Sequence, residues 1–305
     1  MRYVFGPVPS RRLGRSLGVD LVPLKTCSYD CLYCQAGRTT CKSAVPAAYH
    51  PVEDVLRELE ERLLSHSPDV ITFSGSGEPT LHAGIHHVIA GIRFLTDTRV
   101  AVLTNGSLLA VSEVRERLLG ADLVMPTLCT VKEKTFQRIH RPEASLRLDS
   151  IMTGMERFRE EFQGRMDLEV VLLRGINDND EEIAGLARAV DRIRPDRIQL
   201  NTVVRPPSEP DAMALDRGRL EEIRGFLGEK AEVIAFVPLD REAEDTAAFA
   251  QTIRGMSERR PIRVRDVAEA LSLDPREAEK LIHALTAEGR LRVRTYAGEP
   301  YYVAA

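Results

Sequence analysis

The chain has 305 residues, of which 43% are hydrophobic and 29% are charged, and its formal net charge is −4. This length accommodates one large α/β domain with a small appended unit, while the slightly negative charge gives no general electrostatic argument for nucleic-acid binding. The N-terminal residues lack the apolar segment of a signal peptide, no run approaches a membrane span, and five cysteines fit a reducing compartment, so we expect a cytoplasmic protein with no membrane partner.

Short apolar strands alternate with helical stretches along most of the chain. Residues 3–16 are rich in Pro, Gly and Arg, and we expect an irregular segment there. The expected strands are 17–24, 70–73, 100–103, 122–128, 166–173 and 197–203, with a last short strand at 232–236. The expected helices are 51–65, 82–94, 112–119 with Ser112 as N-cap, 149–162 and 180–193. This alternation predicts a parallel sheet with right-handed crossovers and fewer units than a closed eight-stranded barrel.

The composition changes toward the C-terminus. A Pro-rich stretch at 204–215 leaves the last long strand, and a charged helical connector is expected to follow. Asp274 then fits the N-cap of a helix with Pro275 in its first turn, and two short strands flank a turn at 297–300. Two helices and a hairpin of this size resemble a winged helix-turn-helix. We expect three parts: a barrel at 1–240, a connector at 241–258 and a winged helix at 259–305.

Three of the five cysteines, Cys27, Cys31 and Cys34, are spaced C-x3-C-x2-C. A loop this tight can turn three thiolates toward one centre, which suits a soft metal site. A structural zinc site needs four ligands, and a [4Fe–4S] cluster normally takes four cysteines, so three cysteines leave one coordination position open. The alternatives are a disulfide-linked loop, a partial zinc site or unrelated thiols. Cys41 is either a fourth ligand or a bystander thiol, and we favour the bystander.

The pattern C-x3-C-x-aromatic-C, with Tyr33 as the aromatic residue, resembles the signature of the radical SAM superfamily. The resemblance implies a partial (β/α)6 TIM-like barrel in which the three cysteines hold an oxygen-sensitive [4Fe–4S] cluster and the fourth iron binds S-adenosyl-L-methionine (SAM). It also implies reductive cleavage of SAM to methionine and a 5′-deoxyadenosyl radical that abstracts hydrogen from a substrate. An external electron donor such as flavodoxin or ferredoxin is the implied partner.

Two turns after predicted strands resemble SAM-binding motifs of this family. Gly75-Ser76-Gly77-Glu78 is similar to a "GGE" motif with Ser76 in place of one glycine, and Thr104-Asn105 begins a T-N-G turn. The alternatives are a structural glycine-rich junction and an ordinary Asn-Gly turn. The remaining expected cofactor contacts are Tyr33, Arg174 and Asn201, of which Asn201 shares its strand face with Gln199.

Cys129 follows the fourth predicted strand, where many members of the family have a Ser-Leu-Asp type sequence. There it is a candidate catalytic hydrogen donor or a ligand of a second metal, and the alternative is a buried thiol that packs as a small apolar group. Arg11, Arg12 and Arg205 are candidate contacts for an anionic group of the substrate, and the alternative is that they are solvated loop residues.

The barrel region resembles a branch grouped with the wyosine-synthesis radical SAM enzymes of tRNA, which suggests an RNA substrate but does not fix it. The lysines and second cluster of a true wyosine synthase are not evident. Arg290, Arg292 and Arg294 alternate along a predicted wing strand and would face nucleic acid together. For the substrate, the alternative to RNA is a peptide or protein. For the wing, the alternatives to nucleic-acid binding are peptide recognition, dimerisation or capping of the barrel. A non-catalytic iron–sulfur regulator that binds nucleic acid is the alternative from a different class.

Overall fold

One eight-stranded sheet organises the larger part of the molecule. The computed structural model describes residues 3–235, 246–271 and 273–305. The strands run in the order β1 (Val4–Ser10), β2 (Gly14–Val19), β5 (Val70–Phe73), β6 (Arg99–Thr104), β7 (Leu123–Pro126), β8 (Arg165–Leu172), β9 (Arg197–Thr202) and β10 (Ala231–Val233). Neighbours from β2 to β10 are parallel, and β1 pairs antiparallel with β2. The predicted mixed α/β partial barrel is confirmed.

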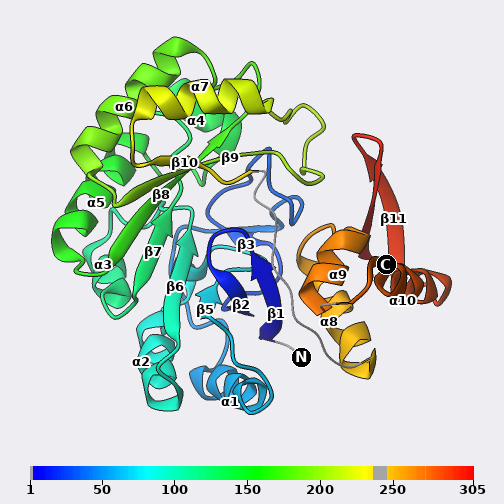
Figure 1. Ribbon diagram of the computed structural model, residues 1–305. Helices are drawn as coiled ribbons and strands as arrows, with labels where there is room; N and C mark the ends of the chain where they lie inside the picture. The colour runs from blue at the N-terminus through cyan, green and yellow to red at the C-terminus, as the bar shows by residue number, and fades with distance from the viewer. Residues whose placement is uncertain (1–2, 236–245, 272) are drawn as a thin grey trace.

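Helices surround the outer side of the sheet (Figure 1). They are α1 (Val52–Leu63), α2 (Ile85–Leu95), α3 (Ser112–Leu118), α4 (Glu133–His140), α5 (Leu148–Glu161), α6 (Asp180–Ile193) and α7 (Arg217–Leu227), with a 3-10 turn, η1, at Pro79–Leu81. The apolar faces of these helices and the central strands form one continuous core. All four residues of β5 are buried, as expected for a parallel strand that is covered on both faces. Two very short strands, β3 (Thr26–Cys27) and β4 (Cys41–Lys42), pair beside the cysteine loop.

The structure corrects several expected elements. The segment 3–16 contains β1, whose register shifts between Phe5 and Val8. Gly and Pro disguise this strand in the sequence, and both are tolerated because β1 is an edge strand. Helices α4 and α7 were not predicted, since each is short and buries only two or three side chains that could mark its inner face. Ser112 is the first residue of α3 and not its N-cap, a position that Val111 occupies without a side-chain hydrogen bond.

The C-terminal residues form a second, smaller hydrophobic cluster. It is built from α8 (Thr246–Arg259), α9 (Val264–Leu271), α10 (Pro275–Ala287) and the hairpin of β11 (Leu291–Tyr296) and β12 (Glu299–Ala304). Asp274 caps α10 by accepting a hydrogen bond of 2.8 Å from Arg276 N–H, as predicted. Val8 of β1 belongs to this second cluster, so the edge strand joins the C-terminal helices to the barrel. The first residues of the predicted connector, 241–245, lie outside the described residues. Phe236, at the end of the last expected barrel strand, also lies outside them.

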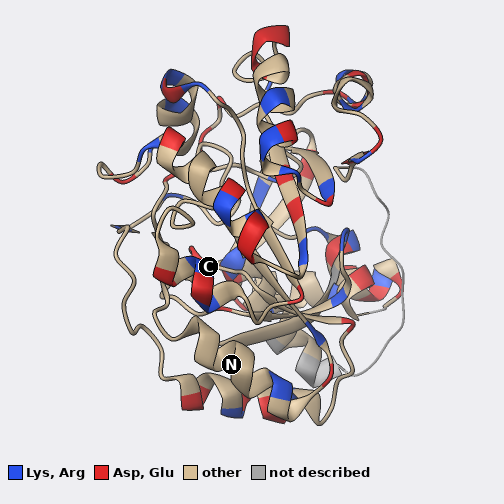
Figure 2. Ribbon diagram, turned by 90° about the vertical axis from the view of Figure 1, so that its left-hand side faces the viewer, with Lys and Arg blue, Asp and Glu red and all other residues tan. Residues whose placement is uncertain are grey.

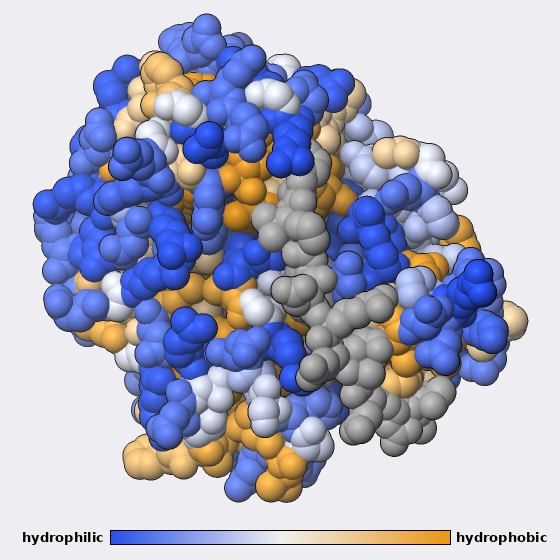
Figure 3. Space-filling model, viewed as in Figure 1, coloured by the Kyte–Doolittle hydropathy of each residue, from blue (hydrophilic) through white to orange (hydrophobic). Residues whose placement is uncertain are grey.

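Charge and hydropathy are distributed over the surface without a large block of either kind. Figure 2 shows Lys and Arg interspersed with Asp and Glu along the outer helices. Figure 3 shows hydrophilic residues over most of one face, with hydrophobic residues gathered in the middle of the ring of helices and at the lower edge. None of the helices within the described ranges is long and apolar enough to cross a membrane.

Candidate functional site

A cavity of about 370 Å³ lies at the carboxyl ends of the parallel strands. Its lining comes from the cysteine loop, the turns after β5 and β6, the inner faces of β8 and β9, the turn between β1 and β2, and the end of α8. The carboxyl ends of barrel strands are where working groups gather in folds of this kind. The cavity is therefore the candidate active site, and residues from both hydrophobic clusters line it.

Cys27, Cys31 and Cys34 all line the cavity as free, partly buried thiols. Each sulfur has a nitrogen close by: Asn105 Nδ2 lies 3.6 Å from Cys27, His140 Nδ1 lies 3.2 Å from Cys31, and Lys25 Nζ lies 3.4 Å from Cys34. Nitrogen donors around ligating sulfurs are the second-shell contacts that tune metal–thiolate centres. The three cysteines thus line one cavity with a nitrogen atom beside each sulfur, an arrangement compatible with an iron–sulfur ligand set.

The electrostatics of the cysteine loop favour a bound cation. Burial, with Glu78 and Cys34 nearby, raises the pKa of Cys27 to about 12, and burial raises the pKa of Cys31 well above its ordinary value. Burial thus disfavours the thiolate form of Cys27 and Cys31, and a bound metal would favour it. No three His, Cys, Asp or Glu side chains in the described ranges converge closely enough to hold a single metal ion.

Glu78 joins the two turns beside the cysteine loop. Its Oε1 accepts hydrogen bonds from Thr80 N–H (3.1 Å), Thr80 Oγ1 (2.6 Å) and Thr104 Oγ1 (2.6 Å), and its Oε2 accepts one from Asn105 N–H (2.7 Å). Burial raises the pKa of this carboxyl, while the bonds from Thr104 and Thr80 act in the opposite direction. Both oxygens of Glu78 are occupied, so its observed role is to hold the turn at Thr104 and Asn105 in place.

The glycines of the first turn allow close packing against the cysteine loop. A Cβ added to Gly77 would lie 1.9 Å from the carbonyl oxygen of Thr26, a contact that no side chain permits. Gly75 has φ +147°, a backbone conformation that favours glycine. These two positions therefore require glycine for structural reasons, and both also line the cavity.

Two expected cofactor contacts do not line the cavity. The hydroxyl of Ser76 donates a short hydrogen bond to Asp20 Oδ2, and Ser76 N–H donates a second one of 3.1 Å to the same oxygen. Ser76 therefore anchors the turn, and Ser74 takes its place in the lining. Arg174 is exposed on the loop after β8, away from the cavity, because the strand ends before this residue. The other expected contacts, Tyr33, Gly75, Gly77, Glu78, Thr104, Asn105 and Asn201, all line the cavity.

Cys129 lies behind the cavity wall. It is fully buried in a small apolar cluster, and its sulfur is 3.6 Å from the Tyr33 hydroxyl oxygen. Burial raises the pKa of Cys129 to about 12. Tyr33 lines the cavity and Cys129 does not, so Cys129 is not placed to contact a molecule bound in the cavity as the structure stands. Cys41 is exposed and lies outside the cavity lining.

A polar network that the sequence analysis did not predict crosses the barrel interior. Glu169 Oε1 accepts hydrogen bonds from Arg12 Nη1 (2.9 Å) and Asn201 Nδ2 (3.0 Å), and Thr127 Oγ1 donates to Oε2 (3.2 Å). The available signal was a pair of acidic residues, Asp167 and Glu169, at alternate positions of this strand, since buried carboxylates need partners. Glu169 and Asn201 both line the cavity, so β8 and β9 present polar side chains to it.

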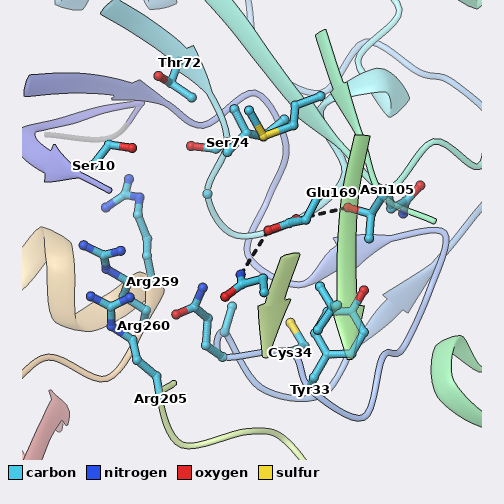
Figure 4. Close-up of a pocket in the computed structure, with 18 of the residues that line it drawn as sticks. Ser10, Tyr33, Cys34, Thr72, Ser74, Asn105, Glu169, Arg205, Arg259 and Arg260 are labelled. Atoms are coloured by element: carbon cyan, nitrogen blue, oxygen red, sulfur yellow. Dashed lines mark hydrogen bonds between the residues drawn. The ribbon is translucent and has the colours of Figure 1, made fainter. Parts of the chain in front are cut away.

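The arginines lie on the side of the cavity opposite the cysteines. Arg11, Arg12 and Arg205 all line the cavity, as the anionic-substrate prediction requires. Arg259 and Arg260, at the end of α8, join them and were not predicted, because their only sequence signal is a basic pair in a charged helical stretch. Figure 4 shows Arg205, Arg259 and Arg260 gathered on one side and Tyr33, Cys34 and Asn105 on the other. The cavity thus has a cysteine side and an arginine side.

The chain is similar in sequence to a known protein family and to several known proteins. A family model described as the radical SAM superfamily matches residues 21–187, which include the cysteine loop and both turns. A UPF0026 protein of Methanocaldococcus jannaschii is 33% identical over 99% of this chain and 96% of its own length. A Brachyspira hyodysenteriae protein named GTPase Obg is 38% identical over 95% of this chain, and the chain spans only 43% of that protein's length.

Solved structures share the fold at low sequence identity. The structure of TYW1 with a lysine-pyruvate adduct bound superposes with a TM-score of 0.55 and 17% identity, covering 73% of this chain and 75% of that one. This likeness concerns the fold of the barrel alone. None of the comparisons described above tests the winged-helix prediction for the C-terminal residues.

Proposed function

The chain belongs to the radical SAM superfamily, whose members use a [4Fe–4S] cluster and SAM, and from this premise we propose that it is an enzyme that abstracts hydrogen from a substrate. When bound, the cluster and SAM would supply reductive cleavage of SAM to methionine and a 5′-deoxyadenosyl radical for hydrogen abstraction, with the one electron coming from a donor such as flavodoxin or ferredoxin. The protein contributes binding, orientation and the exclusion of water.

The residues of the cysteine side take the cofactor-binding roles in this proposal. Cys27, Cys31 and Cys34 would hold the cluster, and Asn105 and Lys25 would donate hydrogen bonds to its sulfur ligands. The turn containing Gly75 and Gly77 would present its backbone to SAM, and Glu78 would keep Asn105 in position. The observation that carries the proposal is that the three cysteines and both turns, which are far apart in the sequence, line one cavity.

The substrate is the finer part of the proposal. Arg292 and Arg294 are exposed on β11, as a strand that contacts RNA would require, but the neighbouring Arg290 pairs with Glu288 at 3.3 Å and Arg265 pairs with Glu299 at 3.2 Å. The hairpin therefore presents a weakly basic surface. The arginine side of the cavity is the better guide, and it favours an anionic substrate, RNA included, over a neutral peptide.

SAM cleavage is the direct test. The cluster is reconstituted anaerobically, SAM and a strong reductant are added, and 5′-deoxyadenosine and methionine are measured by mass spectrometry. We expect both products from the natural protein and from Cys41→Ala, and neither from Cys31→Ala. A fully loaded cluster that neither binds nor cleaves SAM would contradict the proposal and would favour an iron–sulfur regulator.

A further inference from the structure

Five arginines from three distant parts of the chain line the cavity. Arg11 and Arg12 lie in the turn between β1 and β2, Arg205 follows β9, and Arg259 and Arg260 lie at the end of α8. Figure 4 shows the side chains of Arg205, Arg259 and Arg260 extending toward the same region. Like charges repel, so a fold that gathers five guanidinium groups must compensate them or leave them for a ligand.

Three of the five guanidinium groups have a carboxylate partner. Arg12 pairs with Glu169 at 2.9 Å, Arg205 pairs with Asp266 at 3.2 Å, and Arg259 pairs with Asp20 at 3.4 Å. The partners are themselves buried or nearly so, and the pairs are fixed parts of the wall. Compensation therefore extends to three of the positive charges.

The other two have no carboxylate partner among the described residues. Arg11 donates hydrogen bonds to the carbonyl oxygens of Ile234 (3.2 Å) and Ala235 (3.0 Å), which satisfy its donors without cancelling its charge. The guanidinium of Arg260 makes no hydrogen bond or ion pair within 3–235, 246–271 and 273–305, although it is partly buried. In addition, the buried Nε atom of Arg205 lacks a hydrogen-bond partner within the described residues. Unused donors thus point to a missing acceptor.

The two uncompensated charges are close enough to affect each other. Burial lowers the pKa of Arg260 to about 9, with Arg205 and Arg11 acting in the same direction. Burial likewise lowers the pKa of Arg11 to about 10, again with help from Arg205 and Arg12. Both groups therefore destabilise the ligand-free protein, and a bound anion would relieve this cost. Strained electrostatics of this kind are typical of binding sites.

We propose that Arg11, Arg205 and Arg260 bind a phosphate monoester group of the substrate, and that the C-terminal helices complete the substrate site by supplying Arg260. Two positive charges without partners match the two negative charges of a phosphate monoester at neutral pH, whose second pKa is about 6. A carboxylate or a phosphodiester carries one charge and would leave one guanidinium uncompensated. Planar guanidinium groups also suit bidentate contacts with phosphate oxygens.

The packing explains why Arg260 stands where it does. Met256 and Phe249 of α8 share a hydrophobic cluster with Val8 of β1, which holds the helix against the edge of the barrel. The buried pair of Arg205 and Asp266 ties the loop after β9 to α9. The C-terminal helices are therefore fixed to the barrel on both sides of the arginine group, and we assign them a role in substrate binding.

The proposal rests on the proposed function, because it assigns the arginine side to the substrate of the radical reaction, and its test is independent of catalysis. Inorganic phosphate is titrated into the anaerobically reconstituted protein by calorimetry, with acetate as the monoanionic comparison. We expect phosphate to bind and acetate to bind at least about tenfold more weakly, since charge-assisted hydrogen bonds are lost. Equal affinity for the two anions, or no phosphate binding, overturns the proposal.

Variants locate the site. Arg260→Met and Arg11→Met should each weaken phosphate binding by about tenfold or more, Arg260→Lys should weaken it less, and Arg265→Ala, an exposed arginine of α9, should leave it unchanged. Arg260→Met should also have a melting temperature at or above that of the natural protein in the absence of phosphate, since an uncompensated charge is removed. Unchanged phosphate affinity in both methionine variants overturns the proposal.

Two further experiments identify the source of the phosphate group and show whether the arginine site or the proposed function is contradicted. A 5′-phosphorylated RNA oligonucleotide is compared with its 5′-hydroxyl form and with a small sugar phosphate, and the form that binds in an Arg260-dependent manner identifies the substrate class. Equal binding of the two RNA forms, unaffected by Arg260→Met, contradicts the phosphate-monoester site. SAM cleavage without substrate is measured in parallel. If the natural protein does not cleave SAM, the proposed function is contradicted. If it cleaves SAM but does not bind phosphate, only the arginine site is contradicted.

Discussion

The cysteine side and the arginine side of the cavity are built in opposite ways. On the cysteine side, three ligands come from one loop of eight residues, Cys27 to Cys34, with support from the turns after β5 and β6. On the arginine side, Arg11, Arg205 and Arg260 are brought together from positions almost 250 residues apart. The first arrangement is encoded by local spacing, and the second exists only after the barrel has closed and α8 has docked on β1.

Burial also disfavours the charged form of a group on each side of the cavity. Burial raises the pKa of Cys27 to about 12. Burial lowers the pKa of Arg260 to about 9, with Arg205 and Arg11 acting in the same direction and Asp266 opposing them. A ligand of opposite charge would therefore favour the charged form of these groups, a cation at Cys27 and an anion at Arg260. The comparison suggests a cofactor end and a substrate end of one cavity.

The largest effect is expected from removing a cluster ligand. Cys27→Ala, Cys31→Ala or Cys34→Ala should abolish iron incorporation and SAM cleavage, because each of the three thiols would hold one iron. Iron content and the visible absorption of the reconstituted cluster provide the measurement. Cys41→Ala serves as the control, since Cys41 is exposed and outside the cavity. A variant of the triplet that retained a full cluster would break the assignment of the cysteine side.

Glu78→Gln tests how the cysteine side is held together. A glutamine retains one acceptor oxygen. Its NH₂ group would point toward Thr80 or Asn105, whose backbone N–H groups donate to the carboxylate in the natural protein. We expect a loss of about 2–3 kcal/mol in the free energy of unfolding, together with weaker SAM binding, because charge-assisted hydrogen bonds are lost. Denaturant titration and calorimetry measure the two effects, with the surface change Glu53→Gln as the control. Unaltered SAM affinity would show that the turn does not contact the cofactor.

Asp266→Asn tests the joint between the barrel and the C-terminal helices. Burial would raise the pKa of Asp266, but Arg205 and Arg263 hold it down at about 2. Because the folded-state pKa is depressed below the unfolded value, this carboxylate stabilises the protein above pH 4 and its contribution is lost as the pH falls from about 4 to 2. We expect the variant to lose about 2 kcal/mol at pH 7.

The same joint lies at the substrate end, so the cluster content should stay unchanged in Asp266→Asn. Unfolding measured at pH 7 and at pH 3 checks the sign, since the difference between the natural protein and the variant should shrink at the lower pH. A difference that grows on acidification would contradict the role given to this ion pair.

Cys129→Ala should have the smallest effect. It tests whether Cys129 lies outside the reactive part of the cavity. Its sulfur packs behind Tyr33 in an apolar cluster, so we expect a loss of about 1 kcal/mol in stability from the missing contacts and no change in SAM cleavage. Product formation with the natural substrate is the deciding measurement once that substrate is known. A selective loss of product, with SAM cleavage intact, would restore the hydrogen-donor role of Cys129.

Most of the barrel and the cysteine side could be predicted from the sequence, because they rest on local patterns. The parallel strands are apolar runs, and the turns at Gly75 and Thr104 follow them directly. Strand β1 escaped prediction since Pro and Gly disguise an edge strand, and Ser76 was misplaced because its partner Asp20 lies 56 residues away. Glu169, Arg259 and Arg260 acquire their positions from tertiary packing, which no local pattern encodes.

The most direct measurement is an anaerobic crystal structure of the reconstituted protein soaked with SAM and inorganic phosphate. The account predicts a [4Fe–4S] cluster on Cys27, Cys31 and Cys34, SAM next to Asn105, and phosphate between Arg11 and Arg260 at the other end of the cavity. A cluster or SAM bound elsewhere would contradict the assignment of the cavity as the active site. Phosphate bound away from the arginines would contradict the division into a cofactor end and a substrate end.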